Sequence, residues 1–319
     1  MTAARTVGVI GTLVWDRIMG VETGRPPVDA WGGVGYSLAA LSASLPAAWS
    51  VRPIMKLGSD LADEGRSFLG SIPRVDAEAA LIVPEENNRV ELSYDSGSER
   101  VERLRGGVPP WTSAELAPRL EGCDALYVNF ISGFEMDLAT AGTIRALHQG
   151  QTYADLHSLF LGVDADGRRI PRTLDAWEAW FGCFDAVQMN EHEFARLGAD
   201  GEGSASAARL LGPDLHLIAV THGDRGATCH TFEPASGRVA DGSVTLTAER
   251  KSGDPTGCGD VWGGAMFGRL LAGDDVPRAM SEANRLAGLK LGYSGAQGLF
   301  SHFQERAAGA EEHRSEVTN

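Results

Sequence analysis

The stretch Asp254-Pro-Thr-Gly-Cys-Gly-Asp260 is followed directly by Val-Trp-Gly-Gly-Ala-Met-Phe-Gly-Arg-Leu-Leu, which ends at Leu271. Gly257 and Gly259 permit a tight turn, and the apolar residues after them predict a buried helix that begins near Gly259. The first N–H groups of such a helix have no partner within it, and they carry the positive end of the helix dipole. The segment therefore predicts an anion-binding turn of the kind that can hold a phosphoryl group.

Asp260 stands in the first turn of this predicted helix, next to the expected anion. A carboxylate beside a bound phosphate is suited to accept a proton from an attacking hydroxyl group. The same carboxylate could instead complement the helix dipole in an ordinary helix start. The spacing of the residues leaves these two interpretations open.

Short apolar runs alternate with helix-period segments along the rest of the chain. The expected strands are residues 7–10, 125–131, 186–189 and 217–221, and the expected helices are residues 37–45, 136–148 and 204–211. Strand-helix-strand alternation predicts an α/β fold with a mainly parallel sheet whose strands are buried on both faces. Right-handed crossovers place the loops at the carboxyl ends of such strands on one rim, where we expect ligands to bind.

One segment departs from this alternation of strands and helices and predicts a hairpin. Residues 89–94 alternate with period two, residues 95–98 form a turn, and residues 99–104 resume the pattern. Companion strands are expected at residues 21–23 and 29–31. We interpret the inserted segments, about 17–31 and 88–105, as a small β-sheet lid over the rim, and a motionless edge hairpin is the alternative. The polar residues 305–319 predict a frayed tail.

The composition excludes several classes of protein. The 319 residues carry 43 acidic and 28 basic side chains, a formal net charge of −15 that disfavours nucleic-acid binding through a broad basic surface. The four cysteines form no zinc-binding or disulfide-rich pattern, and the histidines have no metal spacing. Neither a secretory signal nor a membrane span is evident, so we expect a cytoplasmic protein. The phosphate-loop signature G-x-x-x-x-G-K-[ST] does not occur.

The segment 254–260 closely resembles the second signature, D-T-x-G-A-G-D, of the ribokinase-like (PfkB) carbohydrate kinases. The resemblance covers residues 7 to 300 and is strongest at residues 254–271. It implies one domain over residues 1–319, a ribokinase-like three-layer α/β/α sandwich with the small lid. It also implies that Asp260 is the catalytic base and that Gly257, Cys258 and Gly259 form the anion hole. Cys258 departs from the family, which has a small Ala or Gly there.

Further matches in the family's order imply a site for the acceptor substrate. Residues 11–16 resemble the family's first strand, whose terminal aspartate binds substrate hydroxyls, and residues 31–37 resemble its glycine pair. The residues 155–159 stand where many sugar kinases of the family carry D-x-N-x-R, with His in place of Asn and no Arg. Arg168 or Arg169 could fold back to replace that charge, although a solvated loop is the favoured interpretation. The resulting acceptor-site residues are Asp16, Gly32, Gly33, Ser37, Asp155 and His157.

The resemblance also implies a site for the phosphoryl donor. Asn190 and Glu193 match the family's N-x-x-E, which handles magnesium and phosphate indirectly, whereas a helix cap and a surface carboxylate are the alternative. Thr221, Gly223 and Gly226 resemble the family's T-x-G-x-x-G turn beside the nucleotide, and Asn284 matches a helix packed against the adenine. The implied cofactors are ATP and Mg²⁺, and the need for a monovalent cation stays open.

The sequence thus predicts an ATP-dependent kinase for a hydroxyl group of a small sugar-like molecule. A nucleoside acceptor of the same fold, a vitamin-like hydroxymethyl heterocycle, and a catalytically reduced ligand sensor are the alternatives. The intact glycines and Asp260 count against the sensor, and the hairpin counts against the heterocycle. By analogy with the family, whose lids often pair between subunits, a homodimer is expected.

Overall fold

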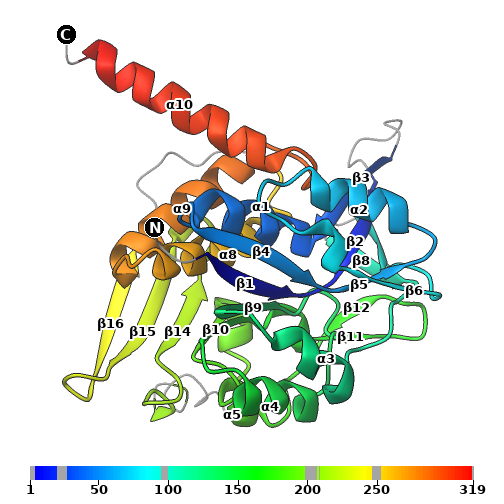
Figure 1. Cartoon of the computed structure of the whole chain (residues 1–319), viewed down its shortest axis with the longest axis horizontal. Helices are drawn as coiled ribbons and strands as arrows, with labels where there is room; N and C mark the ends of the chain where they lie inside the picture. The colour runs from blue at the N-terminus through cyan, green and yellow to red at the C-terminus, as the bar shows by residue number, and fades with distance from the viewer. Residues whose placement is uncertain are drawn as a thin grey trace.

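In the computed structural model, residues 4–19, 27–94, 100–197, 207, 209–245 and 253–317 are described. An eight-stranded sheet has the strand order β16-β15-β14-β13-β10-β9-β1-β4 (Figure 1). The neighbours from β4 to β14 are parallel, and β15 and β16 add an antiparallel edge. Its strands are β1 (Arg5–Ile10), β4 (Trp49–Ile54), β9 (Ala125–Asn129), β10 (Gln151–Asp155), β13 (Ala186–Asn190), β14 (Leu217–Thr221), β15 (Ala227–Glu233) and β16 (Arg238–Val244). The predicted mainly parallel α/β sheet is confirmed.

Two apolar cores, one on each face of this sheet, create the three layers. One face carries α1 (Val34–Ser44), α2 (Ala62–Gly70), α8 (Cys258–Leu271), α9 (Val276–Lys290) and the start of α10 (Leu299–Val317). The other carries α3 (Ser113–Leu120), α4 (Leu138–Leu147) and α5 (Trp177–Phe181). Half of the expected helix over 204–211 lies outside the described residues.

A second sheet has the order β3-β2-β7-β8, and its strands lie within residues 13–33 and 89–105, so they overlap both predicted lid segments but begin before the first one, 17–31. They are β2 (Leu13–Ile18), β3 (Val28–Gly33), β7 (Arg89–Tyr94) and β8 (Arg100–Arg105). The expected companion strand at 29–31 is part of β3, whereas 21–23 lies outside the described residues. We call this sheet the lid sheet, and Figure 1 shows it at one end of the main sheet.

Four shorter strands and several single turns of helix complete the fold. The strands β5 (Lys56–Gly58) and β6 (Leu81–Val83) are parallel, and β11 (Leu161–Val163) and β12 (Arg169–Pro171) form an antiparallel hairpin. The turns are η1 (Ala77–Ala79), η2 (His157–Phe160), α6 (Glu191–Phe194) and η3 (Gly223–Arg225).

Two predictions differ from the structure. Strand β1 ends at Ile10, and Asp16 lies in β2 of the lid sheet rather than at the end of the first strand. Gly11 accounts for the break, because a Cβ there would lie 2.8 Å from Val34 Cγ2 and the chain turns at this close approach. The predicted frayed tail is instead helical to Val317, since residues such as Glu305, Arg306 and Ala307 have high helix propensity.

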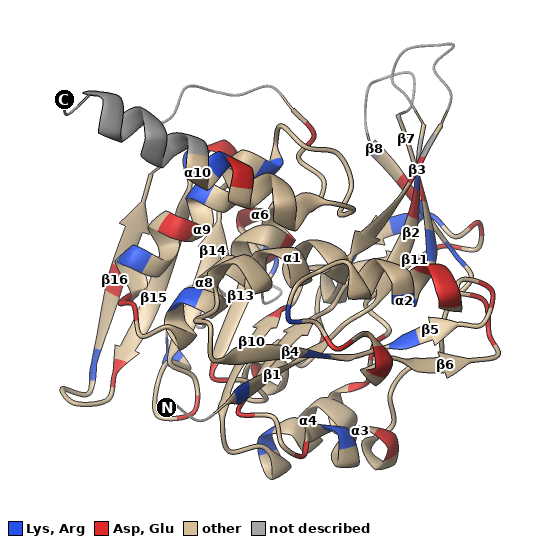
Figure 2. Cartoon of the chain, turned by 45° about the horizontal axis from the view of Figure 1, so that its top comes forward, with Lys and Arg blue, Asp and Glu red and all other residues tan. Residues whose placement is uncertain are grey.

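Charged residues of both signs are interspersed over the elements of the molecule (Figure 2). Within the described part of the chain, none of the helices combines the length and the apolar character that crossing a membrane requires.

Helix α8 packs unusually close to its neighbours through three glycines. A Cβ on Gly263 would lie 2.4 Å from Gln188 Oε1, and one on Gly264 would lie 2.6 Å from the Ser37 carbonyl oxygen. A Cβ on Gly268 would lie 2.8 Å from Ser44 Cβ. The helix therefore approaches the backbone of α1 directly and packs tightly against buried side chains of the sheet, which fixes where its N-terminus lies.

We predict that Gly264→Ala lowers the free energy of unfolding by about 1–3 kcal/mol, because the added methyl group overpacks the α1–α8 contact. The matched control is Gly142→Ala in α4, where a Cβ would meet nothing within 4 Å. That control should be neutral or should stabilise the protein by up to about 1 kcal/mol, because alanine favours helix over glycine. Urea denaturation measures both variants, and equal effects would contradict the close-packing argument.

Candidate active site

The carboxyl ends of the parallel strands bring the polar residues of the predicted site to one rim. In the sheet register Asn129 pairs with Asp155, Asp155 with Gln188, and Asn190 with Thr221. These residues come from β9, β10, β13 and β14, which are neighbours in the sheet although distant in the sequence. The rim is the edge at which ligands bind in open α/β sheets.

The predicted anion-binding turn lies against this rim. Gly257 caps α8 with a left-handed φ of 80°, and a Cβ there would lie 2.5 Å from the ring of Tyr36. Before it, Asp254 Oδ1 accepts a hydrogen bond from the Thr256 amide at 2.9 Å, and the buried Lys290 Nζ donates to the Asp254 carbonyl at 3.1 Å. Space is open around the Cα of Gly259. The hydrogen bonds at Asp254 thus hold the turn in place, and the space beside Gly259 is open.

Cys258 replaces the family's small residue without entering the open part of the turn. Its Sγ is directed toward the Ala287 carbonyl oxygen, 3.6 Å away on α9. Burial raises the pKa of the thiol to about 11, so it is neutral at physiological pH. The side chain therefore packs between helices, and the Cys258 amide donates to the Pro255 carbonyl oxygen at 3.1 Å.

Asp260 is fixed by bonds to two other elements. Asn129 Nδ2 on β9 donates to Asp260 Oδ1 at 2.8 Å. Ser37 Oγ on α1 donates to the Asp260 carbonyl oxygen at 3.1 Å. Burial raises the pKa of Asp260, while the hydrogen bond from Asn129 and the charge of His157 oppose this rise.

Asp155 is joined to the turn by a glutamine. Gln188 Nε2 donates both to Asp155 Oδ2 at 2.9 Å and to the Gly259 carbonyl oxygen at 3.1 Å. The amide oxygen of the same Gln188 accepts from Tyr153 Oη at 2.9 Å. Burial, and then the charge of Asp260, raises the pKa of Asp155 to about 8.

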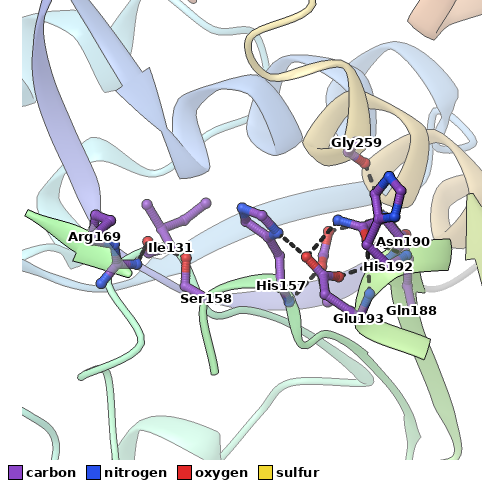
Figure 3. Close-up of polar contacts among 10 residues, drawn as sticks. Ile131, His157, Ser158, Arg169, Gln188, Asn190, His192, Glu193 and Gly259 are labelled. Carbon is purple, nitrogen blue, oxygen red and sulfur yellow. Dashed lines mark hydrogen bonds and ion pairs between the residues drawn. The ribbon is translucent and has the colours of Figure 1, made fainter. Parts of the chain in front are cut away.

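His157 is directed into the rim by a buried carboxylate. Its Nδ1 contacts Glu193 Oε1, as Figure 3 shows, while 49% of its side-chain surface stays exposed. Many protein atoms surround the ring, and this burial acts to lower its pKa. The charges of Glu193, Asp155 and Asp260 outweigh burial and raise the pKa to about 9.

Asn190 and Glu193 form a capping box at the start of α6. Asn190 N donates to Glu193 Oε2 at 2.8 Å, and Asn190 Nδ2 donates to Oε1, which also contacts His157. Asn190 is therefore a helix cap, but Glu193 is a buried carboxylate and not a surface one. Because protein donors already occupy both its oxygens, Glu193 does not fit as a direct metal ligand. Across the described ranges no cluster of His, Cys, Asp and Glu could hold a metal ion.

In the loop after η2, Arg169 folds back toward the rim, whereas Ala165, Asp166 and Arg168 are exposed as the favoured prediction of a solvated loop expects. Arg169 Nη1 on β12 donates to the Ser132 carbonyl oxygen at 2.6 Å, and Nη2 donates to that of Ile131 at 3.3 Å (Figure 3). Burial lowers the pKa of this guanidinium. Arg168 instead forms an antiparallel bridge with Arg103 of the lid sheet. An arginine thus lies on the same side of the site as His157.

The predicted acceptor-site residues lie where the lid sheet meets α1. Asp16 is 5% exposed, and its carboxylate lies so close to Gly32 that a Cβ there would be 1.8 Å from Oδ2. Gly33 has a φ of 59° and caps α1. Ser37 is fully buried and contacts Asp260 and Asn129 instead of open space.

The predicted donor-site residues lie at the next strands of the rim. Thr221 ends β14, and Gly223 and Gly226 both have positive φ in the turn to β15. Space is open around Gly223, whereas a Cβ on Gly226 would lie 2.1 Å from the Val244 carbonyl oxygen. Asn284 on α9 is 7% exposed and accepts from Trp262 Nε1 at 2.7 Å, so it also joins α8 to α9.

Sequence reasoning missed Asn129 and Gln188. Both are amide side chains inside or at the end of otherwise apolar strand runs, and both are almost completely buried. Burying a polar side chain without a hydrogen-bond partner is costly, so an amide in an apolar strand run predicts a specific partner. This was the signal in the sequence that could have identified both residues.

Comparison with known proteins places this geometry in a family. The model of the pfkB family of carbohydrate kinases matches residues 130–302, more than half of the chain. A 2-dehydro-3-deoxygalactonokinase of Haloferax volcanii is 32% identical over 118 residues. That alignment covers 36% of this chain and 35% of the relative, so the chain matches about a third of that protein's length.

Solved structures share the fold across almost the whole chain. A nucleoside kinase of Burkholderia thailandensis in complex with inosine has a TM-score of 0.69 at 17% identity and covers 92% of each chain. A pyrophosphate-dependent kinase of the ribokinase family, complexed with a pyrophosphate analog and myo-inositol, has a TM-score of 0.71 at 17% identity, with 93% of this chain and 99% of that one covered. The ribokinase of Cryptococcus neoformans with ADP has a TM-score of 0.67 at 17% identity and covers 95% and 100%. The predicted ribokinase-like fold is confirmed.

We predict that Asp155→Asn stabilises the protein more at pH 8.5 than at pH 5. Unfolded aspartate has a pKa near 3.8, whereas folded Asp155 has a pKa of about 8. Between these values the folded protein holds a proton that the unfolded chain releases, so its free energy of unfolding falls as pH rises. Asparagine removes this penalty, and we expect a gain of about 1 kcal/mol or more at the higher pH. Denaturant unfolding at both pH values measures it, and a pH-independent difference would contradict the prediction.

Proposed function

We propose that this chain, which belongs to the pfkB family of carbohydrate kinases, transfers the γ-phosphate of ATP to a hydroxyl group of a small sugar or sugar-like molecule. The observation that carries the proposal is the Asp260 carboxylate, held by Asn129 at the N-terminus of α8 directly after the Gly257–Gly259 turn. A base and an anion-binding turn at one point are what phosphoryl transfer to a hydroxyl group requires.

In the proposed reaction, the acceptor hydroxyl attacks the γ-phosphorus while Asp260 takes its proton. The bond between the acceptor oxygen and the γ-phosphorus forms, the bond from that phosphorus to the β,γ-bridging oxygen breaks, and ADP leaves. The amides of Gly257, Cys258 and Gly259 stabilise the negative charge on the transferring oxygens, supported by the dipole of α8. No lysine is needed at that point.

The acceptor is proposed to lie between the rim and the lid sheet. Asp16, Gly32 and Gly33 lie at the base of the lid sheet, and a carboxylate and glycine backbone are groups that can bind hydroxyl groups. Asp155 and His157 are proposed to contact the acceptor together, because the His157 amide donates to Asp155 Oδ1 at 3.1 Å. Ser37 is proposed to act through Asp260, because its side chain is buried against that residue.

The donor is proposed to be Mg-ATP, with Thr221, Gly223, Gly226 and Asn284 on the nucleotide side. The open space at Gly223 and the place of Thr221 at the end of β14 support this side of the rim. Asn190 and Glu193 are proposed to act only indirectly, by holding His157 and the start of α6. A monovalent-cation requirement, a homodimer through the lid sheet and a cytoplasmic location stay predictions.

We predict that Asp260→Asn retains the fold but loses two or more orders of magnitude in turnover, about the contribution of a general base. The measurement is coupled ADP release with Mg-ATP across ribonucleosides, pentoses, ketohexoses and sugar acids. The matched control is Asp274→Asn, which removes an aspartate at the other end of α8, paired with Arg269.

Turnover of one compound that survives in the control and vanishes in the Asp260 variant supports the kinase and names its acceptor class. A ribonucleoside as that compound would favour the nucleoside kinase. Full activity of the Asp260 variant would refute its role as the base. Tight ligand binding in a thermal-shift assay with no turnover of any compound would favour the sensor.

We predict that His157→Asn raises the KM of the acceptor about tenfold or more, because a charged hydrogen-bond donor is lost from the site. The KM of Mg-ATP should change much less, since Thr221 and the turn at Gly223 remain. The control is His216→Asn, at the opposite end of β14 from the rim. Steady-state kinetics measure both constants, and an unchanged acceptor KM would remove His157 from the acceptor site.

A further inference from the structure

We infer that Asn129 is the positioning residue of the base: its side-chain amide holds the Asp260 carboxylate in place and in its charged form for proton transfer. This inference rests on the proposed function, in which Asp260 accepts the proton of the acceptor hydroxyl. It adds a residue that lies outside the glycine-rich segment and far from it in the sequence.

The backbone of Asn129 is held rigidly. It is the last residue of β9, a strand that pairs with β1 on one side and β10 on the other, and its side chain is 0% exposed. A side chain at the end of a central strand has little freedom to follow its partner. Asn129 therefore fixes Asp260, which begins a different element.

The amide uses both of its N–H groups. Asn129 Nδ2 donates to Asp260 Oδ1 at 2.8 Å and to Ser37 Oγ at 2.8 Å. The Ser37 hydroxyl donates its hydrogen to the Asp260 carbonyl oxygen, so the Ser37 Oγ acts as the acceptor for the Asn129 amide. Reversing the amide would place its oxygen against a carboxylate oxygen. The network thus determines the orientation of the amide.

This clamp leaves the second carboxylate oxygen for the reaction. No other residue among those the structure describes donates a side-chain hydrogen bond to Asp260 Oδ2. One oxygen is therefore anchored to β9, and the backbone of the same residue is anchored to α1. These two hydrogen bonds, to the side chain and to the backbone of Asp260, therefore determine where the remaining oxygen, Oδ2, lies.

The clamp is also an electrostatic device. Burial favours the protonated form of Asp260, and the Asn129 hydrogen bond favours the charged form that a base requires. The other titratable groups that face Asp260 come from each neighbouring element: Tyr127 on β9, Asp155 on β10, His157 in η2, Cys258 on α8 and Lys290 on α9. Asn129 is the neutral donor that touches the carboxylate directly.

An independent observation separates this role from ordinary packing. Asn129 Oδ1 is buried and finds no hydrogen-bond partner among the described residues. An unpaired buried carbonyl oxygen costs stability, and leucine would fill a similar volume without that cost. Asparagine at this position is therefore explained by what its N–H groups do to Asp260.

The test compares Asn129→Leu with the parent in turnover, in both KM values and in the pH dependence of kcat/KM, using the acceptor found in the panel. We expect kcat to fall about ten- to hundredfold with each KM within about threefold, since a hydrogen bond to a charged group is lost. The acid limb of kcat/KM should move upward by about one pH unit.

A second variant, Asn129→Asp, preserves the size of the side chain. It tests the inference even if the leucine variant does not fold. A second carboxyl group beside Asp260 should move the acid limb upward as well. The control is Asn87→Leu, because the Asn87 side chain is equally buried at the base of the lid sheet and hydrogen-bonds only to backbone atoms. It should lower the melting temperature and leave the acid limb in place.

An acid limb that stays in place in both Asn129 variants would overturn the inference, and a lower melting temperature would then mark Asn129 as a structural tie only. Asp260→Asn tests the proposed function separately. If that variant loses turnover while Asn129→Leu keeps it, only the inference about Asn129 fails. If Asp260→Asn keeps its turnover, the proposed function fails first.

Discussion

The close packing of α8 against the backbone of α1 and against buried side chains of the sheet is the constraint on which the site depends. Gly263, Gly264 and Gly268 each stand where a side chain would collide with a neighbouring element. With side chains in those places, the helix would be displaced outward. Its N-terminus, with the anion-binding turn and Asp260, would then no longer reach the rim at which β9 and β10 end. The same glycines therefore determine packing and chemistry.

The rim gathers three carboxyl groups beside the predicted anion-binding turn. Asp155, Asp260 and Glu193 lie around a single imidazole, and burial weakens the screening between them. The structure offsets this with neutral donors: Gln188 binds Asp155, Asn129 binds Asp260, and Asn190 binds Glu193. Each carboxylate thus has its own amide. Such pairing fixes three carboxyl groups in position without adding three cations to the rim.

The sequence predicted the main sheet and the turn before α8 because both leave local signals. Apolar runs of strand length and glycines before an apolar helix need no knowledge of distant residues. Asn129 could not be assigned in this way, because its meaning comes from Asp260, which lies far along the chain. The same holds for Arg169, since only the fold shows that its guanidinium reaches the carbonyls of Ile131 and Ser132.

Two other differences between the predictions and the structure have local causes that the sequence pattern does not reveal. Asp16 was expected at the end of the first strand, but the chain breaks at Gly11 and starts a second strand in another sheet. The polar C-terminal segment was expected to fray, yet polarity alone does not oppose a helix built from residues of high propensity.

The bridge between Arg103 of β8 and Arg168 has a consequence for how this molecule can be re-engineered. This bridge, together with the hydrogen bond from the Leu104 amide to the Gly167 carbonyl oxygen, joins the lid sheet to the β11–β12 hairpin. The lid sheet and the loop that carries Arg169 are therefore joined through their backbones. A chimera that imports a lid from another kinase would have to import the hairpin with it, because either half alone would meet an unmatched edge.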